Sequence, residues 1–144
     1  MNMICTLIIK CVQGAYLEEP FGRIIEVPDD ITLGELHDTI QKLTGFDNDH
    51  LFTFFIARGP TGKRTHVVET EAWEEDQGHL YEIALGRVFP LPKHMKLFYW
   101  FDFGDDWMFQ IQRRGRSKPA DSGARYPKII EETGPKPVQY PASD

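Results

Sequence analysis

The amino-acid sequence predicts an α+β protein with a mixed β-sheet, one main helix packed on the sheet, an aromatic β-hairpin and an extended C-terminal arm. Three observations predict this class. Short runs of β-branched and apolar residues, bounded by glycine and proline, recur along the chain and are typical of strands. One segment instead repeats its apolar residues at helical spacing. The 144 residues with 41% apolar content suffice for one domain with its own core.

The N-terminal segment predicts a β-hairpin. Residues 3–12 and residues 23–27 are two runs rich in β-branched and apolar side chains, and the second run ends at Pro28. Residues 14–22, which contain glycine and proline, separate the two runs. We therefore expect two antiparallel strands joined by a long loop.

A helix is predicted directly after this hairpin. Thr32 and Glu35 have the spacing of a capping box, in which each side chain accepts a hydrogen bond from the backbone N–H of the other residue. Gly45 is a natural C-terminal stop. His37 lies one residue beyond the apolar stripe, which predicts a helix-edge residue with a local hydrogen bond. The stripe that should face the sheet consists of Leu33, Leu36, Ile40 and Leu43.

The middle of the chain predicts three further strands. Residues 51–57 are too apolar and aromatic for a half-exposed strand, so we expect them in the centre of the sheet. Residues 65–70 and 80–85 predict short strands. The acidic residues 71–78 fit either a helical turn or a solvated loop.

An aromatic hairpin is predicted over residues 96–103 and 107–113, around Gly104-Asp105-Asp106. The first strand carries large apolar side chains at successive positions, so both of its faces should be covered. We expect Gly104 to adopt a positive φ, and Asp102 or Asp105 to accept backbone N–H groups across the turn.

The composition changes after Arg113, where prolines punctuate a polar stretch. We expect a single α+β domain over residues 1–130. Residues 131–144 are expected to form an extended or disordered tail.

Cysteine usage predicts a reducing compartment, and hydropathy predicts a protein that does not span a membrane. Cys5 and Cys11 lie on one predicted strand about 20 Å apart, too far to pair with each other. We interpret both as buried or half-buried free thiols, which is typical of a cytoplasmic protein. No apolar run is long enough to span a bilayer, so a soluble protein without a membrane partner is expected.

No catalytic residue, metal or cofactor is predicted, because no two histidines have metal-ligand spacing. The carboxylates of Asp102, Asp105 and Asp106 nevertheless leave two interpretations open. Aspartate is common in tight turns, but three carboxylates at one hairpin tip could also hold Mg²⁺ or Ca²⁺. A metal-dependent hydrolase would use Asp102, Asp105 and His50.

The charge distribution raises a nucleic-acid hypothesis. The net charge of −6 opposes general nucleic-acid binding. A local basic block could still contact phosphates beside the rings of Tyr99 and Trp107, although a solvated strand end would have the same composition. This block consists of Arg113, Arg114, Arg116 and Lys118.

The hairpin turn also carries a family resemblance. Asp102-Phe103-Gly104-Asp105 with Trp107, followed by Tyr126-Pro127, resembles the Ri-plasmid ORF-three-like family, also described as insertion-element passenger proteins. The supporting matches include Thr32-Leu33, Leu36-His37, Gly45, His50-Leu51 and Phe54. The resemblance implies an α+β fold with a ubiquitin-like strand–strand–helix opening, and it implies no activity.

The sequence departs from the family pattern at three places. Phe109 stands where a histidine is common, and Phe101 where a tyrosine is common. Ile129-Ile130 and the proline-containing residues 134–137 replace a motif rich in cysteine and proline. A polar or metal site of the family would therefore be incomplete in this chain.

These observations favour a plasmid- or mobile-element-associated, non-catalytic interaction module. Its partner would be an unknown protein, and the chain itself a monomer or weak homodimer. The first alternative is a nucleic-acid-associated accessory protein, and the second is the metal-dependent hydrolase. Candidate binding residues are His37, His50, Tyr99, Asp102, Asp105 and Trp107.

Overall fold

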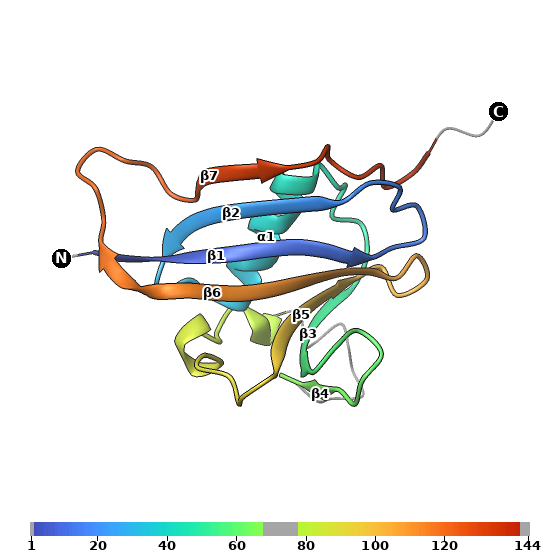
Figure 1. The fold of residues 1–144 in the computed structure, drawn as a ribbon, viewed down its shortest axis with the longest axis horizontal. Helices are drawn as coiled ribbons and strands as arrows, with labels where there is room; N and C mark the ends of the chain where they lie inside the picture. The colour runs from blue at the N-terminus through green and yellow to red at the C-terminus, as the bar shows by residue number, and fades with distance from the viewer. Residues whose placement is uncertain (1, 68–77, 142–144) are drawn as a thin grey trace.

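One β-sheet organises the fold. The computed structural model describes residues 2–67 and 78–141. Within these residues the sheet has seven strands in the order β4-β3-β5-β6-β1-β2-β7 (Figure 1). The elements are β1 (Met3–Gln13), β2 (Phe21–Pro28), α1 (Leu33–Thr44), β3 (Phe52–Ala57), β4 (Thr65–His66), the 3₁₀ turn η1 (Leu85–Arg87), β5 (Lys96–Phe101), β6 (Trp107–Pro119) and β7 (Lys128–Thr133).

Every strand pair among the described residues is antiparallel, so the prediction of a mixed sheet is wrong. The reason lies in the path of α1. The helix carries the chain from β2 to β3, which lies at the far side of the sheet and pairs with β5 instead of a parallel neighbour. The broader α+β prediction, a sheet with one main helix, is confirmed.

The helix forms where its caps predict it. The Thr32 hydroxyl accepts a hydrogen bond from the Glu35 backbone N–H at 3.1 Å, and the Glu35 carboxylate accepts one from the Thr32 N–H at 3.0 Å. Gly45 ends the helix in the left-handed region, with φ 74°. In Figure 1, α1 lies behind the part of the sheet formed by β1, β2 and β6. The side chains of Leu33, Leu36 and Ile40 are fully buried.

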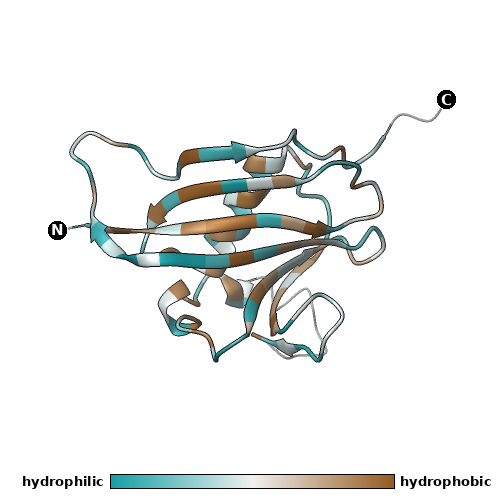
Figure 2. Cartoon of the chain, in the orientation of Figure 1, coloured by the Kyte–Doolittle hydropathy of each residue, from teal (hydrophilic) through white to brown (hydrophobic). Residues whose placement is uncertain are grey.

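Both faces of the sheet carry apolar clusters. The larger one lies on the α1 face and takes alternate residues of β1, β2 and β6, which explains the alternating bands of Figure 2. The smaller one, on the opposite face, contains Phe55, Phe98 and Met108. The Arg64 guanidinium covers this second cluster, 4.4 Å from the centroid of the Phe55 ring and 4.7 Å from that of Trp100. The predicted two-sided apolar character of β5 and β3 follows from these two clusters.

The turn between β5 and β6 differs from its prediction. Positive φ angles of 57° occur at Asp102 and Asp106, whereas Gly104 is not among the positive-φ residues. The Asp106 N–H donates to the Asp102 carbonyl at 2.6 Å, which closes the turn at these two residues. Aspartate tolerates the left-handed region better than most side chains. The expected side-chain contact is present, since Asp102 Oδ1 accepts from the Asp105 N–H at 3.2 Å.

Residues 80–85 do not form the predicted strand. Their backbone is instead fixed at the start of the helix, where the Leu33 N–H donates to the Ile83 carbonyl and the Leu85 N–H to the Ile31 carbonyl. Only an isolated bridge between Thr32 and Ala84 results. The helical turn or solvated loop expected over residues 71–78 lies largely outside the described part of the chain.

The C-terminal segment contains a strand that the sequence analysis did not predict. β7 pairs with β2 along the outer edge of the sheet, and the predicted domain boundary at residue 130 falls inside it. Every residue of β7 is exposed, and a bulge interrupts its ladder with β2 between Ile24 and Ile25. Cys5 and Cys11 are buried free thiols, as predicted. No helix in the described ranges has the length and apolar character needed to cross a membrane.

The packing of α1 leads to a stability prediction. Replacing Leu36 or Ile40 with alanine should each lower the free energy of unfolding by roughly 2–5 kcal/mol, because both side chains are fully buried against the sheet. Urea denaturation would measure the change in the free energy of unfolding. Lys42→Ala on the exposed side of the same helix is the control and should stay within about 0.5 kcal/mol of the parent. Equal effects of all three substitutions would contradict the packing.

Candidate functional site

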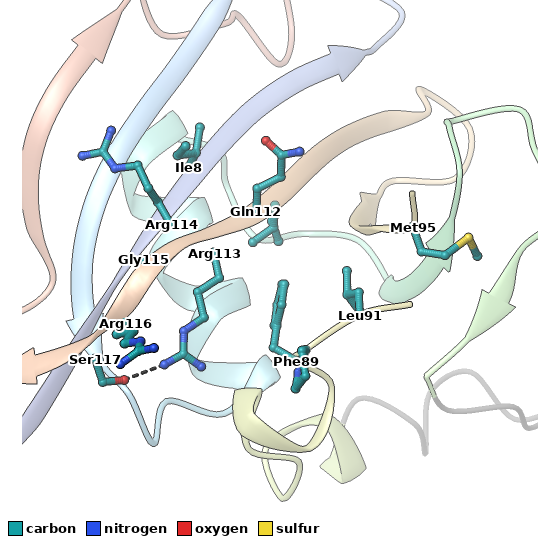
Figure 3. A pocket seen from close by; sticks show the side chains of 12 residues that line it. Ile8, Phe89, Leu91, Met95, Gln112, Arg113, Arg114, Gly115, Arg116 and Ser117 are labelled. Carbon is teal, nitrogen blue, oxygen red and sulfur yellow. Dashed lines mark hydrogen bonds between the residues drawn. The ribbon is translucent and has the colours of Figure 1, made fainter. Parts of the chain in front are cut away.

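A groove of about 810 Å³ lies along the second half of β6. One wall is the loop that precedes β5, which contributes Phe89, Leu91 and Met95. The other wall is β6 itself with its three arginines, and Figure 3 shows the side chains of Phe89 and Leu91 facing that strand. The groove therefore combines apolar surface with positive charge.

The groove exists because β6 is longer than its neighbour β5. The two strands pair only from Phe101 with Trp107 to Leu97 with Ile111. Beyond Ile111, β6 continues to pair with β1, and no other strand among the described residues lies against its opposite edge. The 89–95 loop contains Pro90 and Pro92, which lack backbone N–H groups and disfavour another strand there.

A bulge arranges the arginines of β6. The register with β1 shifts between Ile4 and Thr6, and Gly115 adopts a φ of 73° inside the shift. In Figure 3, Arg113 extends towards the loop side of β6 and Arg114 towards the other side. The Arg113 guanidinium donates a hydrogen bond to the Ser117 hydroxyl, which holds it along the strand.

The positive charge of the groove is not neutralised within the described residues. None of the described lining residues is acidic, and Arg113, Arg114 and Arg116 form no ion pair there. Lys118, the fourth member of the predicted basic block, differs from them. Its ammonium lies 2.8 Å from the Glu26 carboxylate, and that hydrogen bond raises the pKa of Lys118. The arginines thus remain available to an anionic partner.

A buried polar network joins α1 to β5. The His37 Nε2 donates to Asn48 Oδ1 at 2.7 Å, since the amide oxygen is only an acceptor. The neutral ring then accepts at Nδ1 from the Tyr99 hydroxyl. Gln41 closes the network: its side-chain N–H donates to the Tyr99 oxygen at 2.9 Å, and its carbonyl accepts from the Asn48 N–H at 2.9 Å.

The surroundings of His37 keep it neutral. Its ring stacks on Phe52 with centroids 3.6 Å apart, and only 2% of the residue is exposed. Burial lowers the pKa of His37 to about 4, against weaker opposing effects of Asn48 and Asp38. Burial also raises the pKa of Tyr99 well above its usual value. The sequence analysis placed His37 at the helix edge, and the structure corrects this to a buried position in the core.

The second predicted histidine belongs to a surface cluster. The Nε2 of His50 lies 3.3 Å from the Asp102 carboxylate and 2.8 Å from the Tyr140 hydroxyl. Tyr140 donates to Asp49 at 2.7 Å, and the Gln139 side chain donates to the same carboxylate at 2.9 Å. We call these five residues the C-terminal clasp, because they join residues 139–140 to the loop between α1 and β3.

Opposing effects act on the carboxylate of the C-terminal clasp. Burial tends to raise the pKa of Asp49, but the hydrogen bonds from Tyr140 and Gln139 outweigh it and lower that pKa. The same bond to Asp49 raises the pKa of Tyr140 to about 12. Among the described residues, the polar groups next to His50 are the Tyr140 hydroxyl and the carboxylates of Asp49 and Asp102.

The structure separates the predicted binding residues into two groups. His37, Tyr99 and Trp107 are buried, while His50, Asp102 and Asp105 lie near the β5–β6 turn. In the described part of the chain, no three His, Cys, Asp or Glu side chains are placed to hold a metal ion. Burial raises the pKa of Cys11 to about 12 and also raises that of Cys5, so both thiols resist ionisation.

Sequence reasoning missed the apolar wall of the groove and both C-terminal residues of the clasp. A signal for the wall was present, because Phe89-Pro90-Leu91-Pro92 sets large apolar side chains between prolines that disfavour a strand. Gln139 and Tyr140 carried no such signal. Their partners lie about ninety positions away and become adjacent only through the fold.

Comparisons with known proteins give a family from one match and a fold from another. A family model described as plasmid pRiA4b ORF-3-like protein matches residues 12–139. A curated protein of Sinorhizobium fredii, named uncharacterized protein y4hQ, is 27% identical over 137 residues, which cover 95% of this chain and 67% of that protein. The crystal structure of MM3350 from Methanosarcina mazei Go1, a protein of unknown function, superposes with a TM-score of 0.67 at 23% identity. That match covers 92% of this chain and 70% of the other. It shows a shared fold.

The buried histidine leads to a pH-dependence prediction. The pKa of His37 is about 4 when folded and near 6.5 when unfolded, so the unfolded chain binds the proton more readily. The stabilisation is complete above pH 6.5 and is lost as the pH falls towards 4, by roughly 3 kcal/mol in total. Urea denaturation across this range should show the loss.

Two variants isolate the contribution of His37. In His37→Gln, which cannot titrate, the free energy of unfolding should fall less steeply between pH 6.5 and 4 than in the parent. His79→Gln is the control, since the side chain of His79 is 64% exposed, and its profile should follow the parent. Parallel profiles for the parent and His37→Gln would rule out a buried neutral histidine.

Proposed function

Because the chain belongs to the plasmid pRiA4b ORF-3-like family, whose compared relatives are described as uncharacterized or of unknown function, we propose a function from the groove along β6. The protein acts as a non-catalytic interaction module, and the groove docks an extended acidic segment of a partner protein. The plasmid name of the family supports a mobile-element context for that partner.

One observation carries this proposal: three arginines without ion pairs border an apolar groove that has no described acidic lining residue. The whole chain has a net charge of −6, so this groove differs in sign from the rest of the molecule. A locally positive groove on an acidic protein favours ligands that place carboxylates beside the arginines. Phe89 and Leu91 would receive an apolar side chain of the same segment.

An acidic peptide fits this groove better than a nucleic acid does. Tyr99 and Trp107, the rings proposed to stack on bases, have no exposed surface. Lys118 is already paired with Glu26, which reduces the charge available to phosphates. Single-stranded nucleic-acid sites combine exposed aromatic platforms with a longer basic track. Pairing of arginine with a carboxylate requires neither an exposed aromatic ring nor a long row of basic residues.

The opening of the chain supports a ubiquitin-like interpretation of the same module. β1 and β2 form an antiparallel hairpin, and α1 follows directly and covers it. A likeness of fold alone does not imply a role, so the non-catalytic proposal depends on the groove and not on this opening. In this interpretation β3, β5 and β6 complete the sheet on the side where the groove lies.

A charge-matched binding experiment tests the proposal. Fluorescence anisotropy would compare a labelled peptide of alternating Glu and Leu with the same peptide carrying Gln for Glu, and with a single-stranded oligonucleotide of equal charge. We expect the acidic peptide to bind, and Arg113→Glu with Arg116→Glu to weaken that binding by about tenfold or more, equivalent to ~1.4 kcal/mol.

Arg125→Glu is the matched control, because Arg125 is exposed and lies outside the groove. Its affinity for the acidic peptide should stay close to that of the parent. Tighter binding of the oligonucleotide, with the steeper salt dependence of phosphate contacts, would instead establish the nucleic-acid alternative. Equal binding of the Glu and Gln peptides would show that the arginines do not select the partner.

A further inference from the structure

β7 ends the sheet with an open edge. It is the last strand in the order, and each of its residues is exposed. Ile129 and Ile130 are 44% and 48% exposed, which is unusual for isoleucine. An exposed edge strand with apolar side chains is a template for pairing with another strand. In Figure 1, β7 forms the upper margin of the sheet, away from the groove.

The register with β2 shows which charges of β7 share a face. Lys128 lies opposite Glu26, and Glu131 lies opposite Ile24. Because Glu26 and Ile24 are two residues apart on one strand, their side chains point to the same face of the sheet. Lys128 and Glu131 therefore also share a face. The bulge leaves Ile130 without a partner on β2.

We propose that β7 pairs with β7 of a second copy of this chain, antiparallel about a two-fold axis. With the axis between Ile129 and Ile130, Lys128 of each copy lies opposite Glu131 of the other. Two equivalent cross-strand ion pairs form, and the isoleucines of the two copies meet between them. The strand is thus complementary to itself, as an isologous interface requires.

The rest of the sheet explains why the association stops at two copies. In the described part of the sheet the opposite edge is β4, whose two residues are too short a strand to extend a sheet. Once both β7 edges are paired, no long free edge remains at either end of the described sheet. The result is a closed dimer with one continuous sheet, and both β6 grooves stay open.

The experiment measures the association of the full chain by sedimentation equilibrium at low ionic strength. We expect a reversible monomer–dimer equilibrium. Lys128→Glu and Glu131→Lys should each lower the association constant by about tenfold, because each turns two attractive pairs into repulsive ones. The double reversal Lys128→Glu with Glu131→Lys restores both pairs and should return the constant to near the parent value.

A second pair of variants tests the surface itself. Ile130→Lys should abolish the dimer, whereas Val138→Lys should leave it intact, since Val138 is 57% exposed and lies outside β7. Circular dichroism would establish that each variant remains folded. A chain that stays monomeric at every concentration would overturn the proposal. So would equal effects of these two substitutions, failure of the double reversal to restore association, or growth beyond the dimer.

Discussion

The pairing of β1 with β6 holds the molecule together. These strands join the half of the sheet formed by β4, β3, β5 and β6 to the half formed by β1, β2 and β7. Their ladder extends from Met3 with Pro119 to Gln13 with Met108. No other described strand pair links the two halves. The sheet surface that packs against α1 is therefore continuous only because of this ladder. The groove and its arginines depend on the β1–β6 ladder too. Beyond Ile111, β5 no longer pairs with β6, and β1 is the one described strand that holds this part of β6.

The accuracy of the sequence predictions follows the range of the interactions involved. The capping box, the apolar stripe of α1 and the β5–β6 hairpin depend on residues close together in the chain, and all three are present. β7 was missed because its strand character comes from β2, about a hundred residues away, and not from its own alternation. The strand predicted at residues 80–85 fails for the same reason, since the helix start captures its backbone groups.

In the candidate site, too, the features that depend on nearby residues were predicted, and those that depend on distant residues were not. Three arginines of the groove were evident in the sequence as a basic block, whereas the apolar wall became a wall only when the 89–95 loop met β6. His37 was placed at the helix edge because periodicity alone cannot show that a neighbouring loop covers a residue. Asn48 supplies that cover, with a φ of 52° that no local sequence pattern specified. The polar network therefore ties the loop after α1 to the core, and each of its members has a partner.

The C-terminal clasp has a mechanical consequence. β7 is held to the sheet through a single neighbour, so a pull along the chain from its C-terminal side would peel it from β2 one hydrogen bond at a time. Gln139 and Tyr140 come after β7 in the chain and are bound to the loop between α1 and β3. Tension arriving from beyond Tyr140 is therefore transmitted first to Asp49 and His50, in the loop between α1 and β3. The edge strand is shielded from load until the clasp gives way.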